Sequence, residues 1–369
     1  MTTRARRSVA QTLPDFPWDS LTDAKNTAAA HPGGIVDLSV GTPVDPVAPS
    51  IRAALAAVSE APGYPTTHGT PELRAAAVGA LARRYGVTGL VESAILPAIG
   101  TKEMIAWLPT LLGLGAEDLV VIPELAYPTY EVGGLLAGAR LIRADGLNRL
   151  GPERAALVFV NSPSNPTGKV LGLDHLRKVV DWARGRGAIV VSDECYLGLT
   201  WEGEARSILH PSVCDGDHTG LLAVHSLSKT SNLASYRAGF VTGDAELVAE
   251  LLEVRKHTGM MLPLPIQSAM TAALLDDEQE NIQREKYRAR REVLLAAVRG
   301  AGFTVDHSEA GLYLWATRGE ACRATVDWFA ARGILVAPGE FYGPGGVQHV
   351  RIALTATDER IAVAASRLG

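Results

Sequence analysis

The sequence contains little cysteine and no long hydrophobic run, and each shortage excludes a class of protein. Its 369 residues include three cysteines, Cys195, Cys214 and Cys322, with no CxxC pair among them. An odd number of cysteines without paired spacing argues against a disulfide framework and for a reducing compartment. No apolar segment approaches the roughly 20 residues that a membrane-spanning helix needs. We therefore expect a cytoplasmic protein that does not associate with membranes.

Motifs of several common activities are also missing. The basic residues Arg4, Arg6 and Arg7 are not followed by an apolar segment, so no signal peptide is predicted. The nine histidines include no HExxH pair and no close cluster, which predicts that no metal is bound. There is no GxSxG elbow and no complete P-loop or dinucleotide fingerprint. A net charge of −5 disfavours a general attraction to nucleic acid.

Short apolar segments alternate with helical patterns through most of the chain. The expected strands are residues 94–99, 119–122, 139–142, 156–160, 188–191, 221–224 and 238–241. This alternation is typical of an α/β protein with a mostly parallel sheet sandwiched by helices. We expect residues 47–270 to form a large domain of this kind. Residues 271–369 read as a smaller α+β domain, which an N-terminal arm, residues 1–46, is expected to join.

Polar side chains follow five of these expected strands. In a parallel sheet the carboxyl ends of the strands lie at one edge, where ligands bind. The segments after the strands begin at Gly100, Pro123, Asn161, Ser192 and His225. Together they bring an aromatic ring, an amide, a carboxylate, a phenol, hydroxyls, a lysine and the start of a helix to the same edge.

The last of these segments, HSLSKTSNLASYRAGF, contains Lys229 directly after an apolar strand. An unpaired ammonium is costly there, so the lysine needs a neutralising partner or serves as a reactive amine. The helix that starts at Thr101 offers free N–H groups to a phosphate. A lysine that forms a Schiff base, paired with an acidic partner for a pyridinium ring, is the pattern of pyridoxal phosphate (PLP) sites.

These residues resemble the fold-type I PLP-dependent aminotransferases of class I/II, over nearly the whole chain. The motifs that carry the resemblance are Asn165-Pro166-x-Gly168, Asp193-x-x-Tyr196, Ser226-x-Ser228-Lys229 and Arg237, at the spacings of that family.

The resemblance implies a role for each of the following residues. Lys229 would join PLP covalently and later move a proton between the substrate Cα and the cofactor. Asp193 would keep the pyridine nitrogen protonated, Tyr196 and Asn165 would bind the ring's 3-oxygen, and Tyr127 would stack on the ring. The phosphate would be held by Thr101, Lys102, Ser226, Ser228 and Arg237.

Three further residues complete the implied site. Gly41 and Arg351 would hold the substrate α-carboxylate, for which a guanidinium fork is well suited. Tyr64 would reach the phosphate of the partner subunit's site, which implies a homodimer with shared active sites. Taken singly, these residues have plainer interpretations: Asp193 as a turn residue, Tyr64 as loop packing, Arg351 as a surface charge. The joint pattern at the strand ends favours the site.

The sequence resembles one subgroup more closely, the bacterial N-succinyldiaminopimelate aminotransferases. The segments concerned are LPDFPW at 13–18, DLSVGTPVDP at 37–46 and PGYPTT at 62–67. Such an enzyme takes its amino group from glutamate, yielding 2-oxoglutarate, and both of its substrates carry a distal carboxylate. Lys102 is the candidate for that second contact, with a solvated lysine as the alternative. Three alternative functions remain open. They are another class I/II aminotransferase (aspartate, aromatic or branched-chain type), a PLP-dependent C–S β-lyase, and a non-catalytic regulator with this fold.

Overall fold

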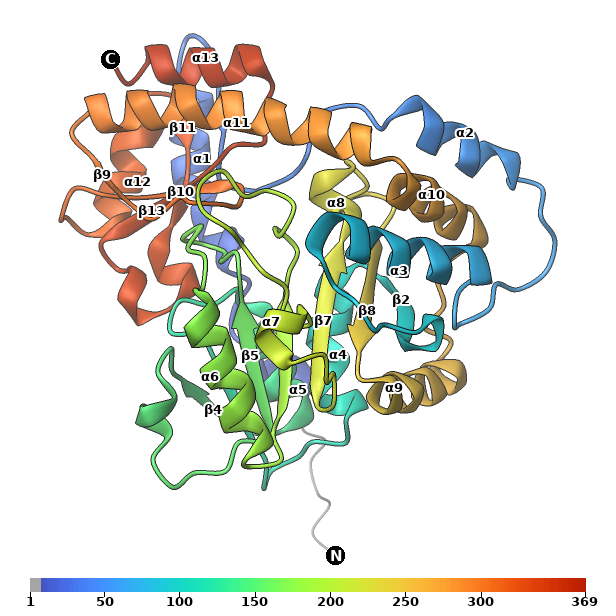
Figure 1. The fold of residues 1–369 in the computed structure, drawn as a ribbon. Helices are drawn as coiled ribbons and strands as arrows, with labels where there is room; N and C mark the ends of the chain where they lie inside the picture. Colours follow the sequence, from blue (N-terminus) through green and yellow to red (C-terminus); the bar gives the residue numbers. More distant parts are fainter. Residues whose placement is uncertain (1–7) are drawn as a thin grey trace, which may run out of the picture.

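The structure is a computed structural model that describes residues 8–369 (Figure 1). The basic residues Arg4, Arg6 and Arg7 lie outside the described part. Within residues 8–369, no helix combines the length and the apolar character needed to cross a bilayer.

A seven-stranded sheet forms the centre of the molecule, in the order β2-β8-β7-β6-β5-β3-β4. Neighbouring strands are parallel except that β8 is antiparallel to both β7 and β2. The double reversal leaves β2 parallel to β7, so that the carboxyl ends of β2, β3, β5, β6 and β7 share one edge. The expected α/β fold with a mostly parallel sheet is confirmed. The strands are β2 (Ile95–Ile99), β3 (Leu119–Ile122), β4 (Arg140–Arg143), β5 (Leu157–Asn161), β6 (Ile189–Asp193), β7 (Leu221–Ser226) and β8 (Ala238–Gly243).

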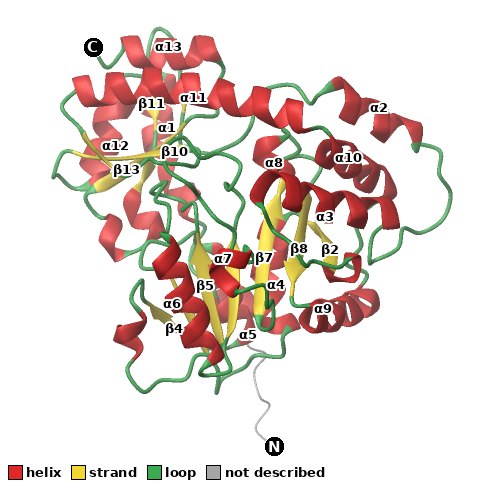
Figure 2. Cartoon of the chain, viewed as in Figure 1, coloured by secondary structure: helices red, strands yellow, loops and turns green. Residues whose placement is uncertain are grey.

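Helices cover both faces of this sheet (Figures 1 and 2). One apolar cluster joins the sheet to α3, α6 and α10, and another joins it to α4, α5 and α9. Strands buried on both sides are apolar over most of their length, as in residues 157–160 of β5 and 221–224 of β7, which is why they were recognisable in the sequence. The helices are α2 (Pro49–Ala57), α3 (Pro71–Tyr85), α4 (Thr101–Leu111), α5 (Thr129–Ala137), α6 (Leu173–Arg184), α7 (Pro211–Cys214), α8 (Leu227–Thr230), α9 (Ala245–Thr258) and α10 (Leu264–Leu275).

The C-terminal quarter of the chain forms a second layer of structure beside the large sheet (Figure 1). An antiparallel sheet in the order β12-β13-β10-β9 packs with three helices. These elements are α11 (Asp277–Gly300), β9 (Thr304–Asp306), β10 (Tyr313–Thr317), α12 (Cys322–Ala330), β11 (Ile334–Leu335), β12 (Ala337–Pro338), β13 (His349–Ala353) and α13 (Asp358–Ser366).

The N-terminal segment packs against this C-terminal part. Helix α1 (Thr22–Ala29) contacts α12, and β1 (Val36–Asp37) pairs in parallel with β11. Leu21, Val36 and Leu38 are buried in the same apolar cluster as the C-terminal strands. In Figure 1 this blue segment lies among the orange and red elements. The domain boundaries themselves stay a prediction.

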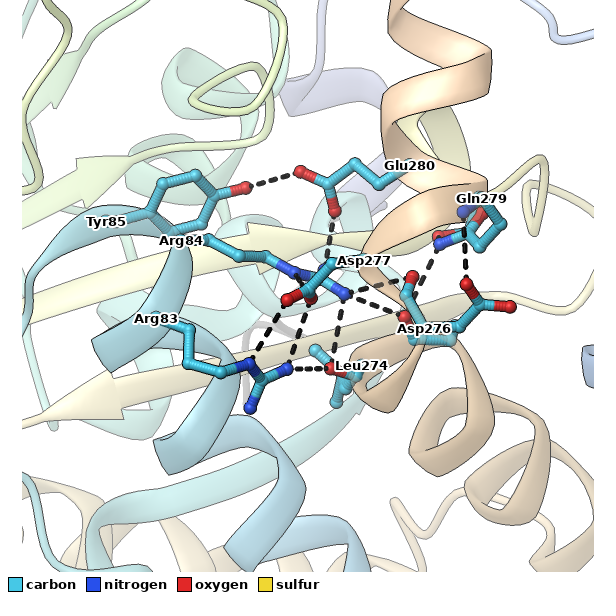
Figure 3. A network of polar contacts seen from close by, with 10 residues as sticks. Arg83, Arg84, Tyr85, Leu274, Asp276, Asp277, Gln279 and Glu280 are labelled. Atoms are coloured by element: carbon cyan, nitrogen blue, oxygen red, sulfur yellow. Dashed lines mark hydrogen bonds and ion pairs between the residues drawn. The ribbon is translucent and has the colours of Figure 1, made fainter.

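The junction between α10 and α11 is held by the C-terminal end of α3 (Figure 3). Arg84 donates to the carboxylates of Asp277 (2.6 Å) and Glu280 (2.5 Å), both in the first turn of α11. Its Nη2 atom also donates to the last carbonyls of α10, including that of Leu274 at 3.2 Å. Arg83 adds a second, more exposed contact to Asp277. These arginines therefore connect α3, which packs on the large sheet, to the first turn of α11, the helix that leads into the C-terminal part.

Candidate active site

A cavity of about 610 Å³ lies at the shared edge of the strands, between the large sheet and the segments of the N-terminal and C-terminal parts. The side chains that sequence analysis assigned to a cofactor and a substrate meet here, with one exception. The predicted residues that line the cavity are Gly41, Thr101, Lys102, Tyr127, Asn165, Asp193, Tyr196, Ser226, Ser228, Lys229, Arg237 and Arg351. The exception is Tyr64, which is 96% exposed in a loop on the surface of this chain.

Lys229 lies in α8, a single helical turn that follows β7 without a break. Ser226 caps this turn, because its side chain accepts from the backbone N–H of Ser228 at 3.1 Å. The ammonium of Lys229 donates to the carbonyl of Gly41, from the N-terminal segment. Desolvation lowers the pKa of Lys229, and the positive charges of Arg351 and Arg237 lower it further. Burial is the largest of these causes.

Asp193 ends β6 and is buried at the floor of the cavity. It accepts a hydrogen bond from the Tyr130 hydroxyl at 2.7 Å and one from the backbone N–H of Cys195 at 3.2 Å. Burial nevertheless raises the pKa of this carboxyl above its usual value. A cation placed beside it would favour the ionised form, so the position suits the protonated nitrogen of an aromatic ring.

Other residues that line the cavity offer donors to an anion. Thr101 is the first residue of the eleven-residue helix α4, whose N-terminal N–H groups face this region. Gly100 precedes it with a φ of 75°, and a Cβ atom there would collide with the guanidinium of Arg237. A glycine is therefore needed for the guanidinium to reach the helix terminus. Ser226 and Ser228 add hydroxyl groups to the lining of the cavity.

Arg351 extends from β13 into the cavity and is buried, not a surface charge. It donates to the side-chain oxygen of Asn165 at 3.0 Å and to the carbonyl of Ser39 at 2.7 Å. Its Nε atom is buried and has no hydrogen-bond partner among residues 8–369. A buried guanidinium with a free N–H group is prepared to bind a carboxylate.

Three residues of this site were missed in the sequence. Tyr130 holds Asp193, and Tyr313 lies between Tyr196 and Arg351. Asn161 donates to the carbonyl of Asp193 at 2.9 Å and accepts from the backbone N–H of Asn165 at 2.7 Å. The sequence places Asn161 directly after an apolar strand, at the ligand-binding edge, but no role was assigned to it. No local signal marks Tyr130 or Tyr313, since their partners are far away in the sequence.

The residues present suit a cofactor with a protonated ring, a carbonyl carbon and a phosphate. The buried acid, the lysine of lowered pKa and the anion-binding helix terminus lie around a single cavity. The glycine that admits Arg237 and the unpartnered Nε of Arg351 are further features that an ordinary packed core would not contain. This donor set defines a site of the PLP type.

Comparison with known proteins agrees with that class. Residues 34–368 match the family model of aminotransferase class I and II. The chain is 71% identical over 364 residues to a probable aminotransferase of Mycobacterium tuberculosis, covering 99% of this chain and 87% of that protein. It is 57% identical over 356 residues to the 4-dedimethylamino-4-oxo-anhydrotetracycline transaminase of Streptomyces rimosus, covering 96% and 99%.

The fold is likewise shared with solved structures. A probable N-succinyldiaminopimelate aminotransferase of Thermus thermophilus is 30% identical with a TM-score of 0.85, covering 96% of this chain and 99% of that one. The chain belongs to the class I and II aminotransferases, a PLP-dependent family of the aspartate-aminotransferase fold. It therefore acts on amino acids and 2-oxo acids.

Proposed function

We propose that this enzyme transfers the amino group of glutamate to a 2-oxo acid that carries a distal carboxylate, with N-succinyl-2-amino-6-oxopimelate as the leading acceptor. The observation that carries the proposal is a cavity lined by a buried guanidinium, Arg351 of β13, and by a lysine, Lys102 of α4. Two cations from different elements suit a substrate with two carboxylates. The likeness to the Thermus thermophilus protein, at 30% identity, supports the same substrate class.

The cavity residues divide the chemical work between them. PLP, when bound, supplies the ring that stabilises the negative charge formed at the substrate Cα. Lys229 holds the cofactor and carries the proton to and from Cα, for which a lowered pKa is required near neutral pH. With PLP bound, Asp193 would keep the ring nitrogen protonated and Tyr127 would pack against the ring face. The ring's 3-oxygen would be bound by Tyr196 and Asn165.

Arg351 and Gly41 orient the amino acid by its α-carboxylate. A bidentate guanidinium fixes both the position and the plane of that group, which brings Cα towards the amine of Lys229. The phosphate would be bound by Thr101, Ser226, Ser228 and Arg237. These contacts would hold the cofactor in one position during the reaction. These roles rest on the placement of each group around the cavity.

Lys102 is proposed to bind the distal carboxylate. Its ammonium lies 5.4 Å from the centre of the Phe16 ring, which comes from the N-terminal segment. No ion pair of Lys102 occurs among the described residues 8–369, so its charge is available to a substrate. Lys25 of α1 lines the same cavity and supplies a further positive charge on the N-terminal side.

A second candidate acceptor is a larger polycyclic ketone, as named for the Streptomyces rimosus relative at 57% identity. The lining of the cavity favours it, because it includes the apolar side chains of Phe16, Trp18, Leu21 and Leu335. A β-lyase reaction on cysteine conjugates is the third candidate. It would release pyruvate and ammonia without any 2-oxo acid acceptor.

The test is an acceptor screen with the PLP-loaded enzyme and glutamate, in which the 2-oxoglutarate formed is measured. We expect the highest kcat/KM with N-succinyl-2-amino-6-oxopimelate. Lys102→Met should lower kcat/KM about tenfold or more for acceptors with a distal carboxylate and little for pyruvate, because one charge-assisted contact is lost. The matched control is Lys256→Met, a lysine paired with Glu253 on the remote helix α9. A preference for polycyclic ketones, or equal losses on both acceptor classes, would contradict the dicarboxylate assignment.

A further inference from the structure

Tyr313 begins β10 in the C-terminal part, yet its side chain lies against groups from three other segments. It is 4% exposed and lines the cavity. Its hydroxyl is 3.2 Å from the hydroxyl of Tyr196, which follows β6 of the large sheet. Its ring lies under the guanidinium of Arg351, with 3.9 Å between the ring centre and Cζ. A Cβ atom at Gly41 would collide with the same ring.

The two hydroxyl groups are not equivalent. Burial raises the pKa of the Tyr313 phenol, but Arg351, Lys229 and the hydrogen bond with Tyr196 outweigh it, and the pKa of Tyr313 lies below its usual value. Burial raises the pKa of Tyr196 well above its usual value. Either hydroxyl can donate in this pair when the cavity holds no cofactor. The Tyr196 hydroxyl carries one proton, so if that proton points into the cavity towards a cofactor oxygen, Tyr313 must be the donor to the oxygen of Tyr196.

The ring of Tyr313 has a separate task. Tyr313 and Arg351 lie on adjacent antiparallel strands, where Trp315 is opposite Arg351 and Tyr313 is opposite Ala353. Diagonal neighbours on one face of a sheet can contact each other when the side chains are long. The aromatic face thus supports a buried cation whose other contacts, Asn165 and the Ser39 carbonyl, come from different parts of the chain.

We propose that Tyr313 is a positioning residue of the transamination reaction: its hydroxyl orients and strengthens Tyr196 as the donor to the cofactor's 3-oxygen, and its ring orients Arg351 for the substrate carboxylate. The proposal rests on the roles proposed above for Tyr196 and Arg351. One side chain then connects the carboxylate site to the group that tunes the cofactor. Hydrogen bonds in such a chain reinforce one another, so removing the first weakens the second.

The hydroxyl is tested by Tyr313→Phe, which keeps the ring. The readout is the pH midpoint of the visible absorption band of the PLP-loaded enzyme without substrate. When PLP is linked to Lys229, its 3-oxygen shares a proton with the linking nitrogen. A hydrogen bond donated to the 3-oxygen favours loss of that proton and so lowers the pH midpoint. A weaker donor therefore raises the midpoint. We expect an upward shift of about half to one pH unit, the size that one hydrogen bond supports. Tyr196→Phe should shift it in the same direction and further.

Combining the two substitutions separates a linked pair from two independent effects. In Tyr196→Phe/Tyr313→Phe the shift should equal that of Tyr196→Phe alone, because Tyr313 acts through Tyr196. Tyr342→Phe is the matched control, since Tyr342 also lies near Arg351, at 5.0 Å, and its buried hydroxyl has no hydrogen-bond partner among the described residues. That substitution should leave the midpoint unchanged.

The ring is tested by Tyr313→Leu. We expect this variant to raise the KM for glutamate about tenfold beyond that of Tyr313→Phe, because it removes the surface under Arg351 as well as the hydroxyl. An unshifted midpoint in Tyr313→Phe, beside a shifted one in Tyr196→Phe, would overturn this inference alone. An unshifted midpoint in Tyr196→Phe would instead overturn the proposed role of Tyr196, and the inference with it. Additive shifts in the double variant would show that Tyr313 does not act through Tyr196.

Discussion

Glu194 and His225 are buried one position away from two residues of the active site, Asp193 and Ser226. The His225 Nε2 and Glu194 Oε2 atoms are 3.6 Å apart, too far for a good hydrogen bond. Burial raises the pKa of Glu194 to about 7 and lowers the pKa of His225 to about 3. Between these values both groups are neutral in the folded protein, so the contact is not an ion pair.

These two groups give the stability a defined pH dependence. Between its usual pKa of 4.5 and about 7, Glu194 binds a proton in the folded chain only, so stability falls as pH rises. Between its usual pKa of 6.5 and about 3, His225 binds a proton in the unfolded chain only, so stability falls as pH decreases. The two slopes oppose each other where they overlap, and the loss from Glu194 is complete above about pH 7.

Glu194→Gln should therefore be stabilising at alkaline pH. Glutamine imitates the neutral acid and can still accept from the backbone N–H of Ile208, which donates to Glu194 at 2.7 Å. We expect the variant to exceed the native protein's free energy of unfolding by about 1 kcal/mol at pH 5.5, where the side chain is already ionised in the unfolded native chain, and by about 3 kcal/mol at pH 8.5. Urea unfolding at both pH values measures this. Glu250→Gln, on the exposed side of α9, should give no such difference, and a variant less stable than native at pH 8.5 would indicate a charged pair instead.

Secondary structure was predictable wherever local pattern determines it. The strands β3 and β7 begin where the sequence predicts, because a short apolar run marks each of them. Helix α9 was missed although its signals exist: Asp244 caps its start and Gly259 ends it with a φ of 70°. By contrast, α1 buries a single alanine, Ala28, and its place depends on packing against α12.

The same limit applies to the site. The sequence predicts that polar residues after parallel strands share one edge, and those residues do line one cavity. It cannot predict contacts between segments that meet only through tertiary structure. Two such contacts are hydrogen bonds: Arg351 donates to the carbonyl of Ser39, and Lys229 donates to the carbonyl of Gly41. A third is the two-residue pairing of β1 with β11.

The junction of α3, α10 and α11 allows a test at the scale of elements. Arg84→Met should lower the free energy of unfolding by about 3–5 kcal/mol, because it leaves the buried carboxylate of Glu280 without its cation. Arg83→Met should cost less than about 1 kcal/mol, since its side chain is 44% exposed. Denaturant unfolding compares the two.

A second substitution checks the reason for that loss. Adding Glu280→Gln to Arg84→Met removes the stranded charge and should recover part of the stability. If Arg83→Met and Arg84→Met lower the free energy of unfolding by the same amount, burial of the ion pair is not what stabilises the first turn of α11.

At the scale of the whole molecule, Tyr64 is the predicted site residue that lies away from the cavity of its own chain. We propose that it completes the site of a partner subunit in a homodimer. Tyr64→Ala and Lys229→Ala should each be inactive or nearly so. Mixed after unfolding and refolded together, they should regain roughly a quarter of native activity, because about half of the dimers are hybrids with one intact site.

That mixture has two informative controls. Each variant refolded alone should stay inactive, and size measurement by light scattering should give a dimer for both. Failure of the mixture to regain activity, with hybrid dimers demonstrated by a tag on one variant, would contradict a shared site.

The central claim is that this chain is a glutamate-dependent aminotransferase whose chemistry centres on Lys229. The most direct measurement adds glutamate, without any acceptor, to the PLP-loaded enzyme. The account predicts loss of the visible absorption band together with stoichiometric formation of 2-oxoglutarate, and recovery of the band when a 2-oxo acid is added. An unchanged band and no 2-oxoglutarate at saturating glutamate would contradict it.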